Sequence, residues 1–82
     1  MKLAEKLVKL INRKYEPGTM VSLRFGQQDI RLRTNKDGNA VQMFIGREKE
    51  GVIRGDRYSR TIITDRGGQP LKDYWERKGK AS

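Results

Sequence analysis

The start of the chain carries apolar and polar side chains in the order expected of an amphipathic helix. Viewed down a helical axis, the apolar side chains fall on one broad arc, and the lysines and Glu5 occupy the other side. The apolar arc consists of Leu3, Ala4, Leu7, Val8, Leu10 and Ile11. We therefore predict a helix over residues 2–14. Pro17-Gly18 ends it, because proline disfavours a helical conformation of the residue before it.

Three stretches then alternate apolar and polar residues with a period of two, which is typical of strands with one buried face. They cover residues 19–25, 29–34 and 40–47. Asp37-Gly38 is favoured in two-residue hairpin turns, and such a turn brings apolar residues of the second and third stretches together on one side. The predicted pairs are Thr34 with Val41, Leu32 with Met43, and Ile30 with Ile45.

A four-residue loop at 26–29 would align the first stretch with the second in the same way. Its predicted pairs are Phe25 with Ile30 and Leu23 with Leu32. Both registers bury the same face of the sheet, and a slip by one residue would expose it. We therefore predict a three-stranded antiparallel meander.

The alternation weakens beyond residue 46. Residues 51–54 and 57–65 are consistent with one bent strand or two short ones, with Gly55-Asp56 as a bulge or tight turn. Residues 65–68 are expected to form a turn or mobile loop. After Pro70 the spacing of the apolar residues predicts a short helical segment with one shared face, formed by Leu71, Tyr74 and Trp75.

Together these elements predict an α+β fold: an N-terminal amphipathic helix packed on one face of a curled antiparallel sheet of four or five strands, with a short C-terminal helical segment. Residues 1–76 would form a single helix-on-sheet domain, because a chain of 82 residues supports one core. Residues 77–82 would form a disordered basic tail.

Composition narrows the chemistry that such a domain can perform. The chain has no cysteine and no histidine, and its carboxylates are scattered over predicted turns. We therefore expect no enzyme activity, no catalytic residues, no cofactor and no bound metal. Charged residues interrupt the apolar positions near the N-terminus, which is unlike a cleavable signal, so a cytoplasmic location is expected.

The formal net charge of +9 favours a polyanionic partner. In the predicted registers, Arg24 faces Arg31, Arg33 lies beside them, and Phe44 also faces Arg31 on the side away from the core. Like charges directly across a strand pair are destabilising unless an anion lies between them. An aromatic ring among guanidinium groups is typical of surfaces that stack a base and hold phosphates.

Further residues extend or weaken this interpretation. Arg54 and Arg60 would border the site, with Arg57 as the alternative to Arg60 depending on the bulge, and Tyr58 is a candidate second stacking platform. Two purely structural roles for Phe44 stay open: the ring packs against arginine stems, or the C-terminal aromatic segment covers it.

We therefore expect a module that grips single-stranded RNA or DNA, or another polyanion, on an arginine-rich exposed sheet face. The alternative is a protein-interaction or structural module for an acidic partner or for self-association, including a homodimer through an edge strand near residues 19–25 or 57–65. We expect no membrane partner, because the apolar helix face lacks Trp and Phe and is needed for the core.

Overall fold

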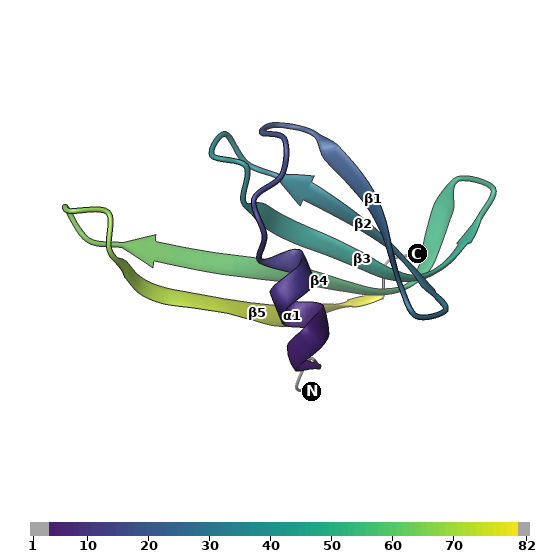
Figure 1. The fold of residues 1–82 in the computed structure, drawn as a ribbon. Coiled ribbons are helices and arrows are strands. Elements are labelled where there is room, and N and C mark those ends of the chain that lie inside the picture. The colour runs from purple at the N-terminus through teal and green to yellow at the C-terminus, as the bar shows by residue number, and fades with distance from the viewer. Residues whose placement is uncertain (1–3, 81–82) are drawn as a thin grey trace.

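The computed structural model describes residues 4–80. One helix precedes five strands, which form a single antiparallel sheet in the order β1-β2-β3-β4-β5. Figure 1 shows the helix lying across one face of this sheet. The elements are α1 (Glu5–Ile11), β1 (Met20–Phe25), β2 (Gln28–Thr34), β3 (Ala40–Lys49), β4 (Val52–Thr64) and β5 (Pro70–Lys80).

The fold is therefore mostly an antiparallel sheet, and the predicted α+β class is wrong. The helix is only seven residues long, where a helix over 2–14 was expected, although residues 2 and 3 lie outside the described part of the chain. It ends early because the following backbone pairs with the turn after β2. Lys14 forms a bridge with Asn39, and the Tyr15 N–H donates to the Gly38 carbonyl at 2.9 Å.

The predicted C-terminal helical segment is also wrong, because residues 70–80 form strand β5. Trp75 faces Arg60 on β4, and the adjacent Tyr74 faces Thr61, so the two aromatic side chains lie on opposite faces of the sheet. The expected basic tail, 77–82, is part of this strand as far as Lys80, and Ala81 and Ser82 lie outside the described residues.

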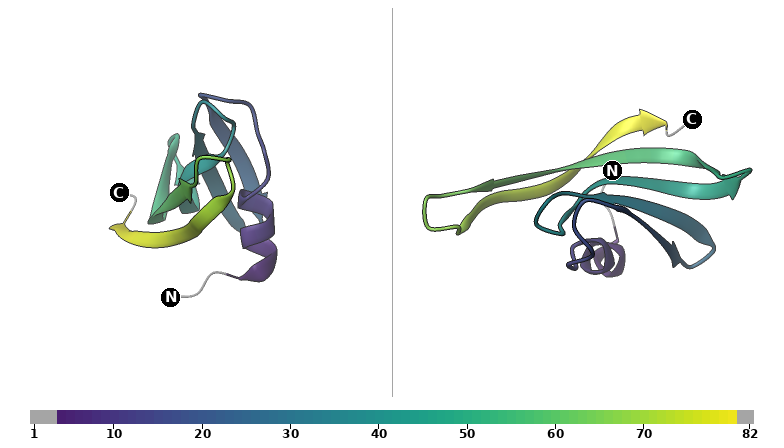
Figure 2. Two further views of the ribbon diagram at one scale, coloured as in Figure 1. Left: turned by 90° about the vertical axis from the view of Figure 1, so that its left-hand side faces the viewer. Right: turned by 90° about the horizontal axis from the view of Figure 1, so that it is seen from above.

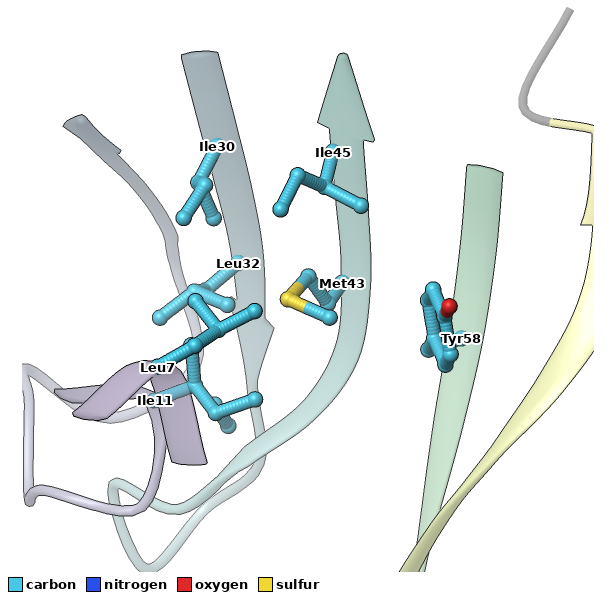
Figure 3. Packing of buried hydrophobic residues seen from close by; sticks show 8 residues of the cluster. Leu7, Ile11, Ile30, Leu32, Met43, Ile45 and Tyr58 are labelled. Atoms are coloured by element: carbon cyan, nitrogen blue, oxygen red, sulfur yellow. The ribbon is translucent and has the colours of Figure 1, made fainter. Parts of the chain in front are cut away.

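The core lies between α1 and the middle of the sheet, as Figure 3 shows. Leu7 and Ile11 are one helical turn apart, so both side chains point toward the strands. The strands supply the remaining buried members of this cluster, namely Ile30, Leu32, Ala40, Met43, Ile45 and Tyr58. Within the described residues, none of β5 is buried, and Trp75 only packs partly against the cluster.

The predicted register of β2 and β3 is confirmed for the pairs Leu32–Met43 and Ile30–Ile45. It changes at Thr34, which faces Ala40. The reason is a longer turn than the two-residue one predicted: the Asn35 N–H donates to the Asn39 carbonyl at 3.0 Å and encloses three residues between them. Gly38 closes that turn with a φ of 81°, which only glycine adopts easily.

The predicted register of β1 and β2 is wrong by two residues. A two-residue loop, Gly26-Gln27, joins the strands instead of a four-residue loop, so Leu23 faces Ile30 and Val21 faces Leu32. A shift of two positions leaves every side chain on its predicted face. The faces are therefore as expected while the partners differ.

Residues 65–69 form a turn, which is one of the two expectations for residues 65–68, a turn or a mobile loop. Its geometry repeats that of residues 35–39, because Asp65 Oδ1 accepts hydrogen bonds from the N–H groups of Gly67 and Gln69, both at 2.9 Å. Asn35 Oδ1 accepts the equivalent bonds in the earlier turn.

The β4–β5 hairpin extends past the rest of the sheet (Figures 1 and 2). The pairing of β3 with β4 reaches only as far as Gln42 and Ser59, so residues 61–74 form a two-stranded projection, here called the ribbon. Polar contacts fix its base. Arg60 donates to both carboxylate oxygens of Asp73 at 2.6 Å, and Trp75 Nε1 donates to Asn12 Oδ1 at 2.8 Å.

Candidate nucleic-acid interface

The face of the sheet opposite α1, here called the outer face, carries polar and cationic side chains across four strands. Alternation along each strand and the observed registers place these residues together. The outer-face residues of β1 to β4 that concern the site are Met20, Ser22, Arg24, Asp29, Arg31, Arg33, Gln42, Phe44, Arg57 and Ser59. The outer face is thus separated from the apolar core by the sheet itself.

The tip of the β3–β4 hairpin folds back over this outer face. β4 is one bent strand, which resolves the alternative left open by the sequence, and the bend lies where Gly46 faces Gly55. A Cβ on Gly55 would lie 2.1 Å from the Ile45 carbonyl oxygen, and one on Gly46 would lie 1.9 Å from that of Arg54. Only glycine permits so close an approach of the two backbones. Figure 2 (left) shows the hairpin tip on the side of the sheet away from α1.

Arg31 holds the folded hairpin in place. Its Nη1 donates to the Gly51 carbonyl at 2.9 Å, and its Nη2 donates to Glu48 Oε1 at 2.5 Å. Ile53, on the inner side of the hairpin, is only 5% exposed although it does not belong to the main core cluster. The hairpin is therefore packed onto the sheet by an ion pair at one point and by apolar contact at another.

The folded hairpin and the start of β1 border a groove on the outer face. It consists of two adjoining hollows of about 420 and 260 Å³ that share Met20 and Phe44. We call this feature the outer groove. Its lining residues are Gly18, Thr19, Met20, Arg31, Arg33, Thr34, Gln42, Phe44, Gly51, Val52 and Ile53.

The two ends of the outer groove differ in chemistry. The smaller hollow is mainly apolar, with Val52 and Ile53 beside the half-buried Phe44 ring. The larger hollow adds the guanidinium of Arg33 and the amide of Gln42. Such a groove can accept a molecule with a flat apolar part and an anionic or hydrogen-bonding part.

The arginines of the outer face are not equally available to a ligand. Arg31 is engaged by Glu48, and Arg24 faces Asp29 with 3.7 Å between Nε and Oδ1. Arg33 and Arg57 have neither a salt bridge nor a side-chain hydrogen bond within the described part of the chain, and Arg57 is the cross-strand neighbour of Phe44 on β4. On the outer face, the guanidinium groups free to bind a ligand are therefore those of Arg33 and Arg57, near the Phe44 ring, rather than those of Arg24 and Arg31.

Four of the six residues predicted for the site share the outer face, and two do not. Arg24, Arg31, Arg33 and Phe44 project from it, although the expected opposition of Arg24 and Arg31 is wrong, because Arg31 faces Ser22. Phe44 faces Arg31 as predicted.

Arg54 and Arg60 point away from the outer groove. Arg54 alternates with Ile53 and so lies on the other side of the hairpin. Arg60 lies on the α1 side, where its side chain is 6% exposed and stacks over Trp75 at 5.9 Å from the ring centroid. Tyr58, the candidate second platform, is buried in the core.

Sequence reasoning missed the apolar wall of the groove. Met20, Val52 and Ile53 come from segments far apart in the chain, and only the bend at Gly46 and Gly55 brings them together. The signal was present as two isolated glycines in otherwise strand-like sequence, which mark a bend or a close backbone approach. Neither glycine alone identifies its partner.

Two carboxylates of β5, Asp73 and Glu76, form ion pairs that lower their pKa. Hydrogen bonding from Arg60 lowers the pKa of Asp73, against a smaller opposing effect of burial. Hydrogen bonding from Lys78 likewise lowers the pKa of Glu76. Across residues 4–80, no three acidic side chains gather in a way that could hold a metal ion.

Comparisons with known proteins add no family to this description. No protein-family model matches the sequence, and searches of curated proteins and of solved structures found no match. Within the described residues, no helix has the length and apolar character needed to cross a membrane.

Proposed function

We propose that this chain is a nucleic-acid-binding module that takes single-stranded RNA or DNA into the outer groove. The observation that carries the proposal is the placement of Phe44 and the unpaired guanidinium of Arg33 in one groove, with Arg57 beside the ring, on a chain of net charge +9. A single strand offers both complements, an unstacked base for the ring and a phosphate for each guanidinium. A cytoplasmic location remains part of this proposal.

The assignment of roles follows from which groups are already engaged. Arg33 and Arg57 would contact phosphates, because binding them does not require breaking an existing ion pair. Phe44 would stack a base in the apolar part of the groove. Arg31, predicted to hold a phosphate, is instead assigned to positioning the hairpin through Glu48 and Gly51, and Arg24 would add charge at the far end of the face.

Duplexes fit this groove less well than single strands do. Bases in a duplex are stacked on each other, so their faces are not open to Phe44 unless the helix is opened. The proposal therefore requires a preference for single strands that depends on the ring, over and above the attraction of any polyanion to a basic surface.

The test is a fluorescence anisotropy titration of a labelled single strand of about 12 nucleotides at several salt concentrations. Phe44→Leu keeps apolar bulk in the groove but removes the aromatic face, and should weaken single-strand binding by about 5- to 100-fold with little effect on duplex binding. Arg33→Gln should lower the slope of log affinity against log salt by about 0.7.

Arg66→Gln provides the matched control, because it removes the same charge from the exposed turn at the far end of the ribbon. It should leave both the ring dependence and the preference for single strands unchanged. Equal losses in Arg33→Gln and Arg66→Gln, together with an unaffected Phe44→Leu, would show a generic charge effect and reject the groove as the binding site.

A further inference from the structure

The backbone of β5 has one side without a neighbour. In the described part of the chain β5 pairs only with β4, along Pro70–Lys80, and stands at the end of the strand order. An edge strand of eleven residues presents a row of N–H and C=O groups that can pair with another strand. β1, the other edge, has six residues. Of the segment 57–65 that the sequence suggested as an edge, residues 57–59 are covered by β3, whereas residues 60–64 pair only with β5 among the described strands.

The ribbon also carries most of the exposed large hydrophobic residues of the described chain. Three of the five large hydrophobic residues that are exposed lie on it: Ile63, Leu71 and Tyr74. A two-stranded ribbon without a third strand or a packed face is marginally stable in water. Addition of a strand at β5 would supply the missing neighbour and cover part of this surface.

The order of charges along β5 identifies the strand that fits. We propose that β5 pairs antiparallel with β5 of a second copy of this chain, about a two-fold axis at Tyr74. In that register Tyr74 faces its own copy, and Lys72 of each chain faces Glu76 of the other. Two opposite-charge pairs then flank an aromatic pair on the same face, which is a favourable cross-strand arrangement. In the single chain Lys72 has no ion-pair partner among the described residues, whereas Glu76 pairs with Lys78.

Neighbouring registers bring like charges together. Residues that lie directly opposite each other in two paired β5 strands point to the same face of the sheet. The two-fold axis must therefore pass through a residue, and the neighbouring registers place it one residue earlier or one residue later. An axis at Asp73 makes that carboxylate face its own copy. An axis at Trp75 makes Lys72 face Lys78, and the Asp73–Arg77 pairs that it also forms join groups already bound by Arg60 and Asp56 within each chain. The arrangement centred on Tyr74 avoids both contacts.

The other face of the proposed pairing leaves no uncompensated charge. There Asp73 would face Trp75 and Leu71 would face Arg77. Asp73 is already bound by Arg60, and Arg77 donates to Asp56 Oδ1 from Nε at 3.1 Å and from Nη2 at 2.8 Å. On this face, Asp73 and Arg77 have no charged partner in the other chain, and both are already neutralised within their own chain.

The proposed dimer is independent of the outer groove. β4 contributes only its first residues, Val52 and Ile53, to the lining of the groove, and no residue of β5 lines it. Two grooves would stay open in the dimer, so a failure of oligonucleotide binding would not affect this inference, and a monomeric chain would not affect the groove.

Sedimentation equilibrium with charge variants of the intact chain tests the pairing. Wild-type protein should show a monomer–dimer equilibrium. Lys72→Glu and Glu76→Lys should each weaken self-association by about tenfold, because each turns two attractive pairs into repulsive ones. An equimolar mixture of the two variants should dimerise as well as wild type, because both cross-chain pairs are then of opposite charge.

Lys36→Glu is the control, since it makes the same charge change on an exposed lysine in the turn after β2. It should leave the dimer unchanged, and circular dichroism of every variant should match wild type. A wild-type chain that is monomeric up to millimolar concentration overturns the proposal. So does a mixture of Lys72→Glu and Glu76→Lys that associates no better than either variant alone.

Discussion

The two ends of this small sheet are stabilised in different ways. β1, β2 and β3, together with α1, contain every buried member of the main apolar cluster except Tyr58. The ribbon and the rest of β5 contain no buried residue among those described. Apart from the partial packing of Trp75 against the cluster, their fixed contacts are polar: Arg60 with Asp73, Arg77 with Asp56, and Trp75 with Asn12. Burial of apolar surface contributes about 1.5–3 kcal/mol per large side chain, while an exposed ion pair such as Arg77–Asp56 contributes about 0–1 kcal/mol.

The region that supplies most of the stability therefore differs from the region that stays accessible to a partner. The helix-covered strands form a rigid support on which the outer groove is built, since Phe44 and Arg33 alternate with the buried residues of β3 and β2. The ribbon keeps its backbone edge and its apolar side chains accessible. A region held by a few polar contacts is also the one expected to open first.

Truncation of a leucine in each region should give the largest contrast. Leu32 is 0% exposed and Leu71 is 64% exposed. Leu32→Ala should lower the free energy of unfolding by about 3 kcal/mol, because it leaves a cavity in the core, whereas Leu71→Ala should change it by less than about 0.5 kcal/mol. Urea unfolding followed by circular dichroism measures both. Both variants are measured in dilute protein, where the chain is monomeric. Similar losses in the two variants would then contradict the difference between the two regions.

A methyl group at the bend should have the next largest effect. Gly55→Ala would press its Cβ against the Ile45 carbonyl and should cost about 2 kcal/mol while displacing the hairpin tip from the outer groove. Gly67→Ala is the matched change in the ribbon turn, where the added Cβ would lie at an ordinary contact distance of 3.5 Å from Asp65 Oδ1, and it should be nearly neutral. The same unfolding assay measures stability, and oligonucleotide affinity reports on the groove.

Neutralising Asp73 should have a moderate effect that is confined to the ribbon. Asp73→Asn removes the negative charge that accepts hydrogen bonds from Nε and Nη2 of Arg60. The largely buried guanidinium then lacks its carboxylate partner, which should lower the free energy of unfolding by about 1–2 kcal/mol. Hydrogen exchange of β5 amides should accelerate more than that of β2 amides. Equal acceleration in both strands would contradict the separation into two regions.

Acid should weaken the same contact, with the smallest effect. Because the pKa of Asp73 is lowered in the folded chain, its pairing contributes fully above the ordinary Asp pKa of about 4 and is lost as the pH falls below that value. Wild-type stability should therefore converge toward that of Asp73→Asn on acidification. Unfolding at a series of pH values tests this, and a constant gap between the two proteins would show that the carboxylate charge is not responsible.

The fold could be predicted where burial imposes a period of two. Ile30, Leu32, Met43 and Ile45 alternate with polar residues, so their faces and pairing followed from the sequence. The spacing of Leu71, Tyr74 and Trp75 is typical of a helix, but this segment buries none of its residues and carries no alternation that would identify a strand. Pairing with β4 decides its conformation, and a single sequence does not reveal that pairing.

The site was predictable only in part, for a related reason. The outer positions of β2 and β3 followed from the buried ones, which placed Arg31, Arg33 and Phe44 correctly on one face. Whether an arginine is free depends on long-range contacts. Arg31 meets Glu48 and Gly51 only because the hairpin folds over, and Arg60 meets Asp73 only because β5 is a strand.

The most direct test of this account is to map oligonucleotide binding on the intact chain by the backbone amide shifts of ¹⁵N-labelled protein. We predict that a single strand shifts amides along the outer groove, at Met20, Arg33, Phe44 and the hairpin tip, and leaves those of α1 and the ribbon turn unchanged. Shifts confined to α1 or the ribbon turn, or the absence of any shift at low salt and saturating oligonucleotide, would contradict it.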